Sequence, residues 1–138
     1  MNNILLDTSF VIALNNPKDR YHPRAYKFVS ETKDNLIVPE VALTETAFML
    51  AQAGGFPAVI AFLDRLVETE TPLQNLSLND LLRARQIMAA YPEARFDFVD
   101  CCIMSLAERL DIRQICTFDR RDFSIFRPKH CEFLELLP

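Results

Sequence analysis

The sequence predicts an α/β fold, a three-layer α/β/α sandwich around a central, mainly parallel sheet. Short apolar runs at residues 4–6, 36–38 and 115–118 have the length and composition of buried strands. Segments with the apolar spacing of amphipathic helices separate these runs, and strands that alternate with helices pair in parallel. Because helices cover both faces of such a sheet, ligands bind at the carboxyl ends of its strands.

The N-terminal half of the chain begins this alternation. After the first strand we expect a helix capped by Thr8 or Ser9, whose hydroxyls can accept a hydrogen bond from a free backbone N–H. A second helix is predicted over residues 20–32. Pro39 suits the first turn of a long helix, where its missing N–H is harmless, and Gly54-Gly55 is a natural end for that helix.

The C-terminal half continues the same pattern. Pro57 is expected to begin a helix that reaches about residue 67, and Ser77 or Asn79 to cap a later helix that reaches about residue 91. The remaining predictions are strands at 72–76 and 133–137 and a helix over 98–110. Since no repeat, low-complexity tract or long linker divides the chain, residues 1–138 are predicted to form a single domain.

Charge and composition narrow the classes of function. The formal net charge of −4 and the pI near 5.1 argue against a simple basic nucleic-acid binder, unless some of the acids hold a metal ion that cancels their charge. The N-terminus lacks the basic segment of a signal peptide, and no apolar run approaches the length of a membrane span. We therefore expect a cytoplasmic protein that does not associate with a membrane. The four cysteines lack zinc-site spacing and are expected to be buried, reduced thiols.

Four acidic residues lie inside or directly beside apolar segments: Asp7, Glu45, Asp100 and Asp119. Carboxylates are rarely buried unless they are paired, hydrogen-bonded or bound to metal. Asp7 and Asp119 follow two predicted strands, where an ordinary turn explains either residue taken alone. Glu45 has apolar neighbours one turn away in both directions, which places it on the apolar stripe of its helix. Four such positions predict one acidic cluster at the carboxyl edge of the sheet.

Asp97 and Asp100 compete for one role at the start of the helix over 98–110. Asp97 is a good N-cap and Asp100 would then lie in the first turn, so capping alone explains both residues. Asp100, however, is also at the centre of an apolar helix face, which a cap does not require. We assign Asp100 to the cluster and Asp97 to a cap or an outer position.

Other charged residues near these motifs have simpler explanations. Glu40 complements the dipole of a helix N-terminus, and Asp122 is assigned to a loop or a cap. Arg120 and Arg121 belong to a basic run, which is usually a solvated surface. Their place beside Asp119 also suits a contact with a phosphate backbone.

These motifs resemble those of PIN-domain ribonucleases, and of the VapC-like toxins of toxin–antitoxin pairs in particular. The likeness lies in the opening LLDTSFVIAL, in Glu45, in Asp-x-x-Ile-x-x-x-Ala from Asp100 to Ala107, and in TFDRRDF from Thr117. It implies a three-layer PIN-like fold and a Mg²⁺- or Mn²⁺-dependent endoribonuclease that leaves 5′-phosphate and 3′-hydroxyl ends. Residue by residue, the four acids match the family's metal-binding acids, and Thr117 matches a hydroxyl that orients the last of them. The resemblance also implies a homodimer and a neutralising antitoxin protein.

The residues support this chemistry and leave two alternatives open. Hard cations such as Mg²⁺ prefer oxygen ligands, and they can polarise a phosphodiester without any histidine. One alternative is a catalytically silent PIN-like module that binds RNA or a protein. The other is an aspartyl phosphotransferase with Asp7 as nucleophile, although the second acid that dehalogenase-like enzymes carry two residues later is here Ser9.

Overall fold

A computed structural model describes residues 1–138 and contains one five-stranded sheet in the order β3-β2-β1-β4-β5. The strands, all parallel, are β1 (Asn3–Leu6), β2 (Asn35–Pro39), β3 (Leu73–Gln74), β4 (Gln114–Cys116) and β5 (Glu135–Leu137). The central strand β1 pairs Leu5 with Ile37 on one side and with Ile115 on the other. The predicted parallel sheet is confirmed.

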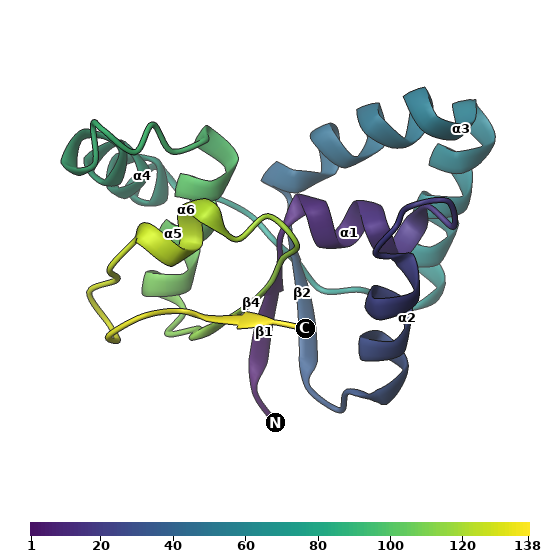
Figure 1. The fold of residues 1–138 in the computed structure, drawn as a ribbon, viewed down its shortest axis with the longest axis horizontal. Coiled ribbons are helices and arrows are strands. Elements are labelled where there is room, and N and C mark those ends of the chain that lie inside the picture. Colours follow the sequence, from purple (N-terminus) through teal and green to yellow (C-terminus); the bar gives the residue numbers. More distant parts are fainter.

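Helices cover both faces of this sheet, so the predicted three layers are also confirmed (Figure 1). One layer contains α1 (Thr8–Asn15), α2 (His22–Glu31) and α3 (Val41–Glu68), and the other contains α4 (Leu78–Ala90), α5 (Phe98–Arg109) and α6 (Arg121–Ile125). Side chains alternate along β1: Leu5 packs into the core beneath α4 and α5, while Ile4 and Leu6 pack into the core beneath α1 and α3. Each face of the sheet therefore has its own hydrophobic core.

Two local predictions were wrong at the ends of helices. The N-cap of α1 is Asp7, whose carboxylate accepts from the Thr8 N–H, and not Thr8 or Ser9. Pro39 ends β2 and does not begin a helix, because the N–H of Glu40 still pairs with the carbonyl of Gln74 in β3 at 2.8 Å.

The long helix α3 consists of two helical segments that meet at a kink, so the predicted stop at Gly54-Gly55 is confirmed. Gly55 is non-helical there, at φ 70° and ψ −166°, and the second segment is the helix predicted to begin at Pro57. A glycine with positive φ can end a helix, but proline at the next turn can restart it at once. α6 is a short helix that was not predicted, and Asp122, assigned to a loop or a cap, lies in its first turn.

The helix α3 also has the length and apolar composition of a membrane span, with mean hydropathy 1.6 over an 18-residue window. The prediction that no segment approaches this length was wrong. Only 17% of that window is buried, and Phe48, Phe56, Ile60 and Val67 are among its exposed side chains. A continuous exposed apolar face of this kind marks a contact surface.

Candidate active site

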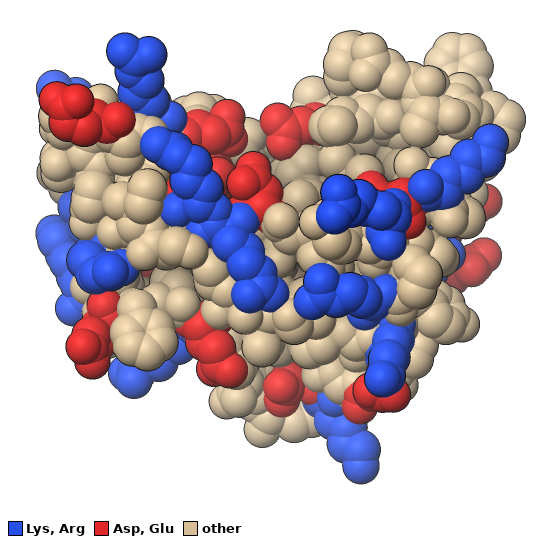
Figure 2. Space-filling model, viewed as in Figure 1, with Lys and Arg blue, Asp and Glu red and all other residues tan.

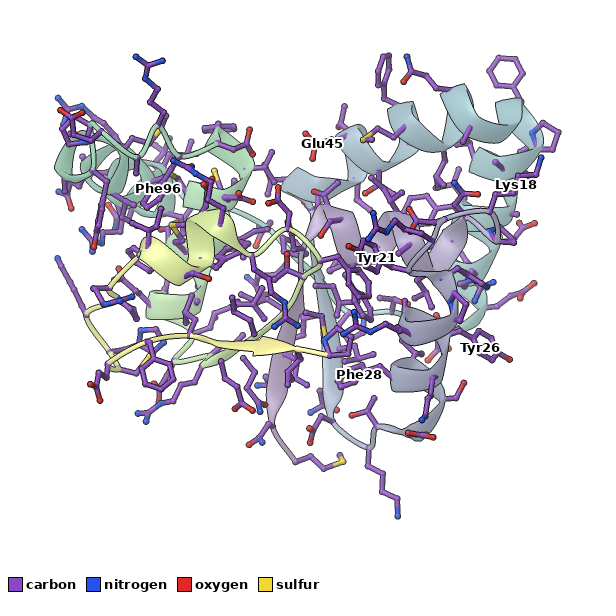
Figure 3. All side chains as sticks on the ribbon, viewed as in Figure 1. Lys18, Tyr21, Tyr26, Phe28, Glu45 and Phe96 are labelled. Atoms are coloured by element: carbon purple, nitrogen blue, oxygen red, sulfur yellow. The ribbon has the colours of Figure 1, made fainter.

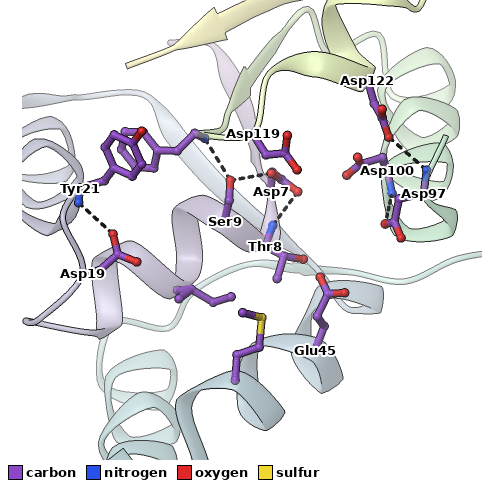
Figure 4. Close-up of a pocket in the computed structure, with 13 residues that line it drawn as sticks. Asp7, Thr8, Ser9, Asp19, Tyr21, Glu45, Asp97, Asp100, Asp119 and Asp122 are labelled. Carbon is purple, nitrogen blue, oxygen red and sulfur yellow. Dashed lines mark hydrogen bonds between the residues drawn. The ribbon is translucent and has the colours of Figure 1, made fainter. Parts of the chain in front are cut away.

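A cleft of about 490 Å³ opens at the carboxyl end of the sheet, and acids dominate its lining (Figure 4). The four predicted residues all line it. Its seven acidic side chains are Asp7, Asp19, Glu45, Asp97, Asp100, Asp119 and Asp122. The cleft lies at the edge predicted from the parallel sheet, because β1 and β4 both end there.

Asp7 is held rigidly at the floor of the cleft. The N–H of Thr8 donates to its Oδ1 at 2.7 Å, and the hydroxyls of Ser9 and Thr117 donate to its Oδ2 at 2.8 and 2.7 Å. Its own N–H continues the pairing of β1 with β4 through the carbonyl of Cys116 at 2.9 Å. With only 4% of its surface exposed, Asp7 is placed by its neighbours and not by solvent.

A second group of acids gathers at the N-terminus of α5. Asp97 caps the helix by accepting from the N–H groups of Val99 and Asp100 at 3.1 and 3.4 Å, as the sequence predicted. Asp100 points inward and is 7% exposed. Asp122 accepts from the backbone N–H of Asp97 at 3.0 Å and is 8% exposed, so its predicted assignment to a loop or cap missed its place in the cleft. Phe118, Ile125 and Phe126 lie four residues before, three after and four after Asp122, so the apolar spacing that singled out Glu45 could also have singled out Asp122.

Glu45 and Asp119 approach the cleft from opposite sides. Glu45 projects from the N-terminal part of α3 into the space between the two halves of the molecule (Figure 3). The apolar stripe predicted around it is divided: Ala42 is fully buried and Val41 packs against the core, whereas Phe48 and Met49 are 62% and 44% exposed. Asp119 is exposed just past β4, and its N–H donates to the Thr117 hydroxyl at 3.0 Å. Thr117 therefore connects the turn that carries Asp119 to Asp7.

Residues 4–127 match the family model described as "PIN domain". The chain belongs to the PIN-domain family. A curated relative, Ribonuclease VapC26 from Mycobacterium tuberculosis (strain ATCC 25618 / H37Rv), is 28% identical over 125 residues, which cover 91% of this chain and 93% of that protein. The resemblance inferred from the motifs is thereby confirmed.

Solved structures share the fold over almost the whole chain. The crystal structure of the sarcin-ricin loop cleaving toxin VapC20 from Mycobacterium tuberculosis has a TM-score of 0.83 at 24% identity, and the match covers 98% of this chain and 99% of that one. VapBC2 from Rickettsia felis, bound to a DNA fragment from its promoter, has a TM-score of 0.68 at 12% identity and covers 97% of this chain and 96% of that one. At these identities the likeness shows the PIN fold.

The buried acids of this PIN domain repel one another. Burial raises the pKa of Asp7, against the effect of its three hydrogen bonds. Burial, followed by the negative charges of Asp7, Asp122 and Asp97, raises the pKa of Asp100 to about 9. No arginine or lysine forms an ion pair with Asp7 or Asp100, so no protein cation offsets this repulsion.

A hard divalent cation fits such a donor set. The donors are carboxylate oxygens, the ligands that Mg²⁺ and Mn²⁺ prefer. No group of three acidic, histidine or cysteine side chains is close enough together to hold an ion by itself. This spread suits Mg²⁺, which usually takes one or two carboxylates and completes its shell with water and substrate phosphate.

The two arginines after Asp119 differ in their contacts. Arg121 donates to Asp122 Oδ1 at 2.7 Å and to the carbonyl of Ala94 at 2.6 Å, so its guanidinium helps to hold Asp122. Arg120 is exposed, and its guanidinium donates only to an oxygen of Pro138, at 2.8 Å. RNA contact stays a prediction for both residues, and the structure leaves Arg120 the freer of the two.

Proposed function

We propose that this PIN domain is a Mg²⁺-dependent endoribonuclease, with Mn²⁺ as an alternative ion, and the toxin of a toxin–antitoxin pair acting in the cytoplasm. The observation that carries the proposal is the pair of buried, mutually repelling carboxylates, Asp7 and Asp100, neither of which forms an ion pair with an arginine or a lysine. A stable protein keeps such a costly arrangement where a bound cation compensates it. The relative named as a ribonuclease supports the same activity.

The residues of the cleft would act by position and charge. Asp7, Glu45, Asp100 and Asp119 are the residues that would hold Mg²⁺, directly or through its water ligands. The ion would supply polarisation of the scissile phosphate and a lower pKa for the attacking water. The hydroxyls of Ser9 and Thr117 fix the orientation of the Asp7 carboxylate, and Asp97 fixes the first turn of α5 that carries Asp100. Water attacks phosphorus, the bond from phosphorus to the 3′ oxygen breaks, and that oxygen takes a proton. The products carry 5′-phosphate and 3′-hydroxyl ends.

Geometry disfavours the aspartyl phosphotransferase hypothesis. A nucleophilic carboxylate needs an oxygen that is free to attack. Both oxygens of Asp7 accept short hydrogen bonds, and the residue is nearly inaccessible. Position 9, where such an enzyme would carry its second acid, holds a serine that donates to Asp7.

The partners follow from the exposed apolar surfaces. Relatives of known structure include VapBC assemblies, in which a toxin is present with its antitoxin. The exposed apolar faces of α3 and α4, with Phe56 82% and Leu78 84% exposed, offer area for an antitoxin and for a homodimer. Size measurements of the chain alone, and after co-expression with the product of the neighbouring reading frame, test both partners.

Cleavage of RNA with defined metals tests the activity. The purified chain should cleave a labelled RNA in Mg²⁺ or Mn²⁺ and not in EDTA, and the products should carry 5′-phosphate ends. Calorimetry of Mg²⁺ binding distinguishes the nuclease from the catalytically silent module, for which no Mg²⁺ binding at the cleft is expected. Metal-independent cleavage, or cleavage that survives Asp100→Asn, would remove the basis of the proposal.

A further inference from the structure

A column of aromatic rings stands beside the acidic cleft. The ring of Phe118 stacks against those of Phe10 and Tyr21, with centroids 5.6 and 4.4 Å apart and interplanar angles of 15° and 4°. Tyr21 and Phe118 also line the cleft (Figure 4). The Asp19 carboxylate accepts from the Tyr21 N–H at 2.8 Å, and Ser9 Oγ accepts from the Phe118 N–H at 3.0 Å. Hydrogen bonds thus fix the backbone on both sides of the stack.

Three arginines lie on or next to this column, and we call Arg20, Arg24 and Arg120 the arginine track. The guanidinium carbon of Arg20 is 4.7 Å from the centroid of the Tyr21 ring, and that of Arg24 is 5.4 Å from the centroid of Phe118. The guanidinium groups of Arg24 and Arg120 both donate to an oxygen of Pro138, the last residue, at 3.3 and 2.8 Å. The three side chains therefore occupy one continuous site.

No acidic side chain pairs with the arginines of the track. All three residues are exposed, and none of them forms an ion pair with an Asp or Glu side chain. Two of the paired arginines, Arg83 and Arg109, lie instead on the surface formed by α4 and α5. Figure 2 shows arginine and lysine side chains gathered around a hollow that contains acidic side chains.

Exposed guanidinium groups held on aromatic rings are suited to bind single-stranded RNA. Their N–H groups bind phosphate oxygens in pairs, and their outer faces stack on bases. Aromatic rings that restrain them lower the entropy lost on binding. An RNA entering the cleft also meets seven acids, so a cationic surface at its edge is needed to offset their repulsion of the phosphates. An acidic protein, the other ligand that a cationic surface could bind, would use the positive charges but not the faces that stack on bases.

We propose that the arginine track binds the single-stranded RNA on one side of the scissile phosphate and guides it into the cleft. Arg20 and Arg24 supply stacking and phosphate contacts, and Arg120 contacts a phosphate next to the acids. The proposal rests on the proposed ribonuclease function for the meaning of the cleft. RNA binding by the track is a property that can be measured without cleavage.

The test compares binding and cleavage in one double variant, Arg20→Met/Arg24→Met. Methionine keeps most of the contact with the rings and removes both charges. The matched control is Lys33→Met/Arg113→Met, which removes two exposed charges next to the amino ends of β2 and β4, away from the cleft. Anisotropy of a labelled single-stranded RNA of about 12 nucleotides reads binding in EDTA. Cleavage of the same RNA in Mg²⁺ is measured separately.

We expect the track variant to bind at least about tenfold more weakly than the wild type, with a log–log salt slope shallower by about 1.4, or about 0.7 for each lost phosphate contact. KM should rise while kcat at saturation stays the same. The control should match the wild type. In Arg20→Lys/Arg24→Lys the salt slope should be kept and part of the affinity lost, because lysine keeps the charge without the planar stacking face.

The possible failures point to different hypotheses. If the track variant and the wild type bind RNA with equal affinity, and thermal melts show that both are folded, the proposal that the track binds RNA is wrong. The arginines would then be a surface for an acidic protein. If the wild type cleaves no RNA yet the track variant binds RNA more weakly, the track stands and the ribonuclease proposal falls. A matching loss in the control variant would show nonspecific charge attraction and also overturn the track.

Discussion

Asp7→Asn is the substitution whose consequences can be worked out most fully from the structure. The new amide can keep its oxygen on the Thr8 N–H and turn its NH₂ toward the hydroxyls of Ser9 and Thr117. Those hydroxyls can then donate elsewhere, since the Asp119 carbonyl lies 2.9 Å from Thr117 Oγ1 and the two hydroxyl oxygens are 3.3 Å apart. The hydrogen-bond network is therefore preserved while its negative charge is lost.

The expected effects on stability and activity differ sharply. Stability should change by no more than about 1 kcal/mol, because the hydrogen bonds are exchanged and not removed. Activity should fall by about 10²–10³, the size of the loss when one preorganised electrostatic partner is removed from a site of this kind. A substitution that leaves the fold and removes the chemistry separates a functional acid from a structural cap.

The assay is single-turnover cleavage of a fluorescent RNA over a Mg²⁺ titration, with thermal unfolding measured on the same samples. Asp111→Asn is the matched control, because Asp111 is exposed at the far edge of the sheet and its positive φ of 52° suits asparagine. The control should cleave like the wild type. Cleavage by Asp7→Asn within about threefold of the wild-type rate would refute the role of Asp7, and so would loss of activity explained by unfolding.

Three further predictions concern stability. Asp100→Asn should raise the melting temperature in EDTA, by removing repulsion from Asp7, and reduce the further rise caused by Mg²⁺; an unchanged response to Mg²⁺ contradicts this. Arg109→Met should cost about 2–3 kcal/mol in urea unfolding, because Asp80 is 2% exposed and loses donors at 2.7 and 3.0 Å. Burial alone would raise the pKa of Asp80, but the hydrogen bonds from Arg109 and Ser77 lower it overall. The stabilisation by the Arg109–Asp80 pair is therefore complete above about pH 4, and it is lost as the pH falls through the pKa of Asp80 in the folded protein. The variant should accordingly be less sensitive to acid, and an equal acid transition would disprove the assignment. Gly55→Ala should destabilise by roughly 1 kcal/mol or more, owing to the positive φ at this position, and a neutral result would show that the bend of α3 relaxes.

The fold followed from the sequence because its signals are local. Short apolar runs separated by helical periodicity require a covered parallel sheet, and that sheet places Asp7 and Asp119 on one edge. Signals at helix ends were weaker, since Pro39 can end a strand as well as begin a helix. Whether Pro39 ends a strand or begins a helix depends on whether β3 lies near enough to pair with the Glu40 N–H. The position of β3 is a matter of tertiary structure.

The sequence by itself determined the PIN-like architecture, the four acids and their edge of the sheet, because apolar patterning and the ends of parallel strands depend on near neighbours. The tertiary structure decided which residues join them. It brought Asp122 into the cleft and paired Arg121 with it, and it left Phe48 and Met49, one turn after Glu45, exposed to solvent. It also stacked Tyr21 on Phe118 beneath free arginines. These contacts join segments far apart in the chain, and no periodicity in the sequence records such pairings.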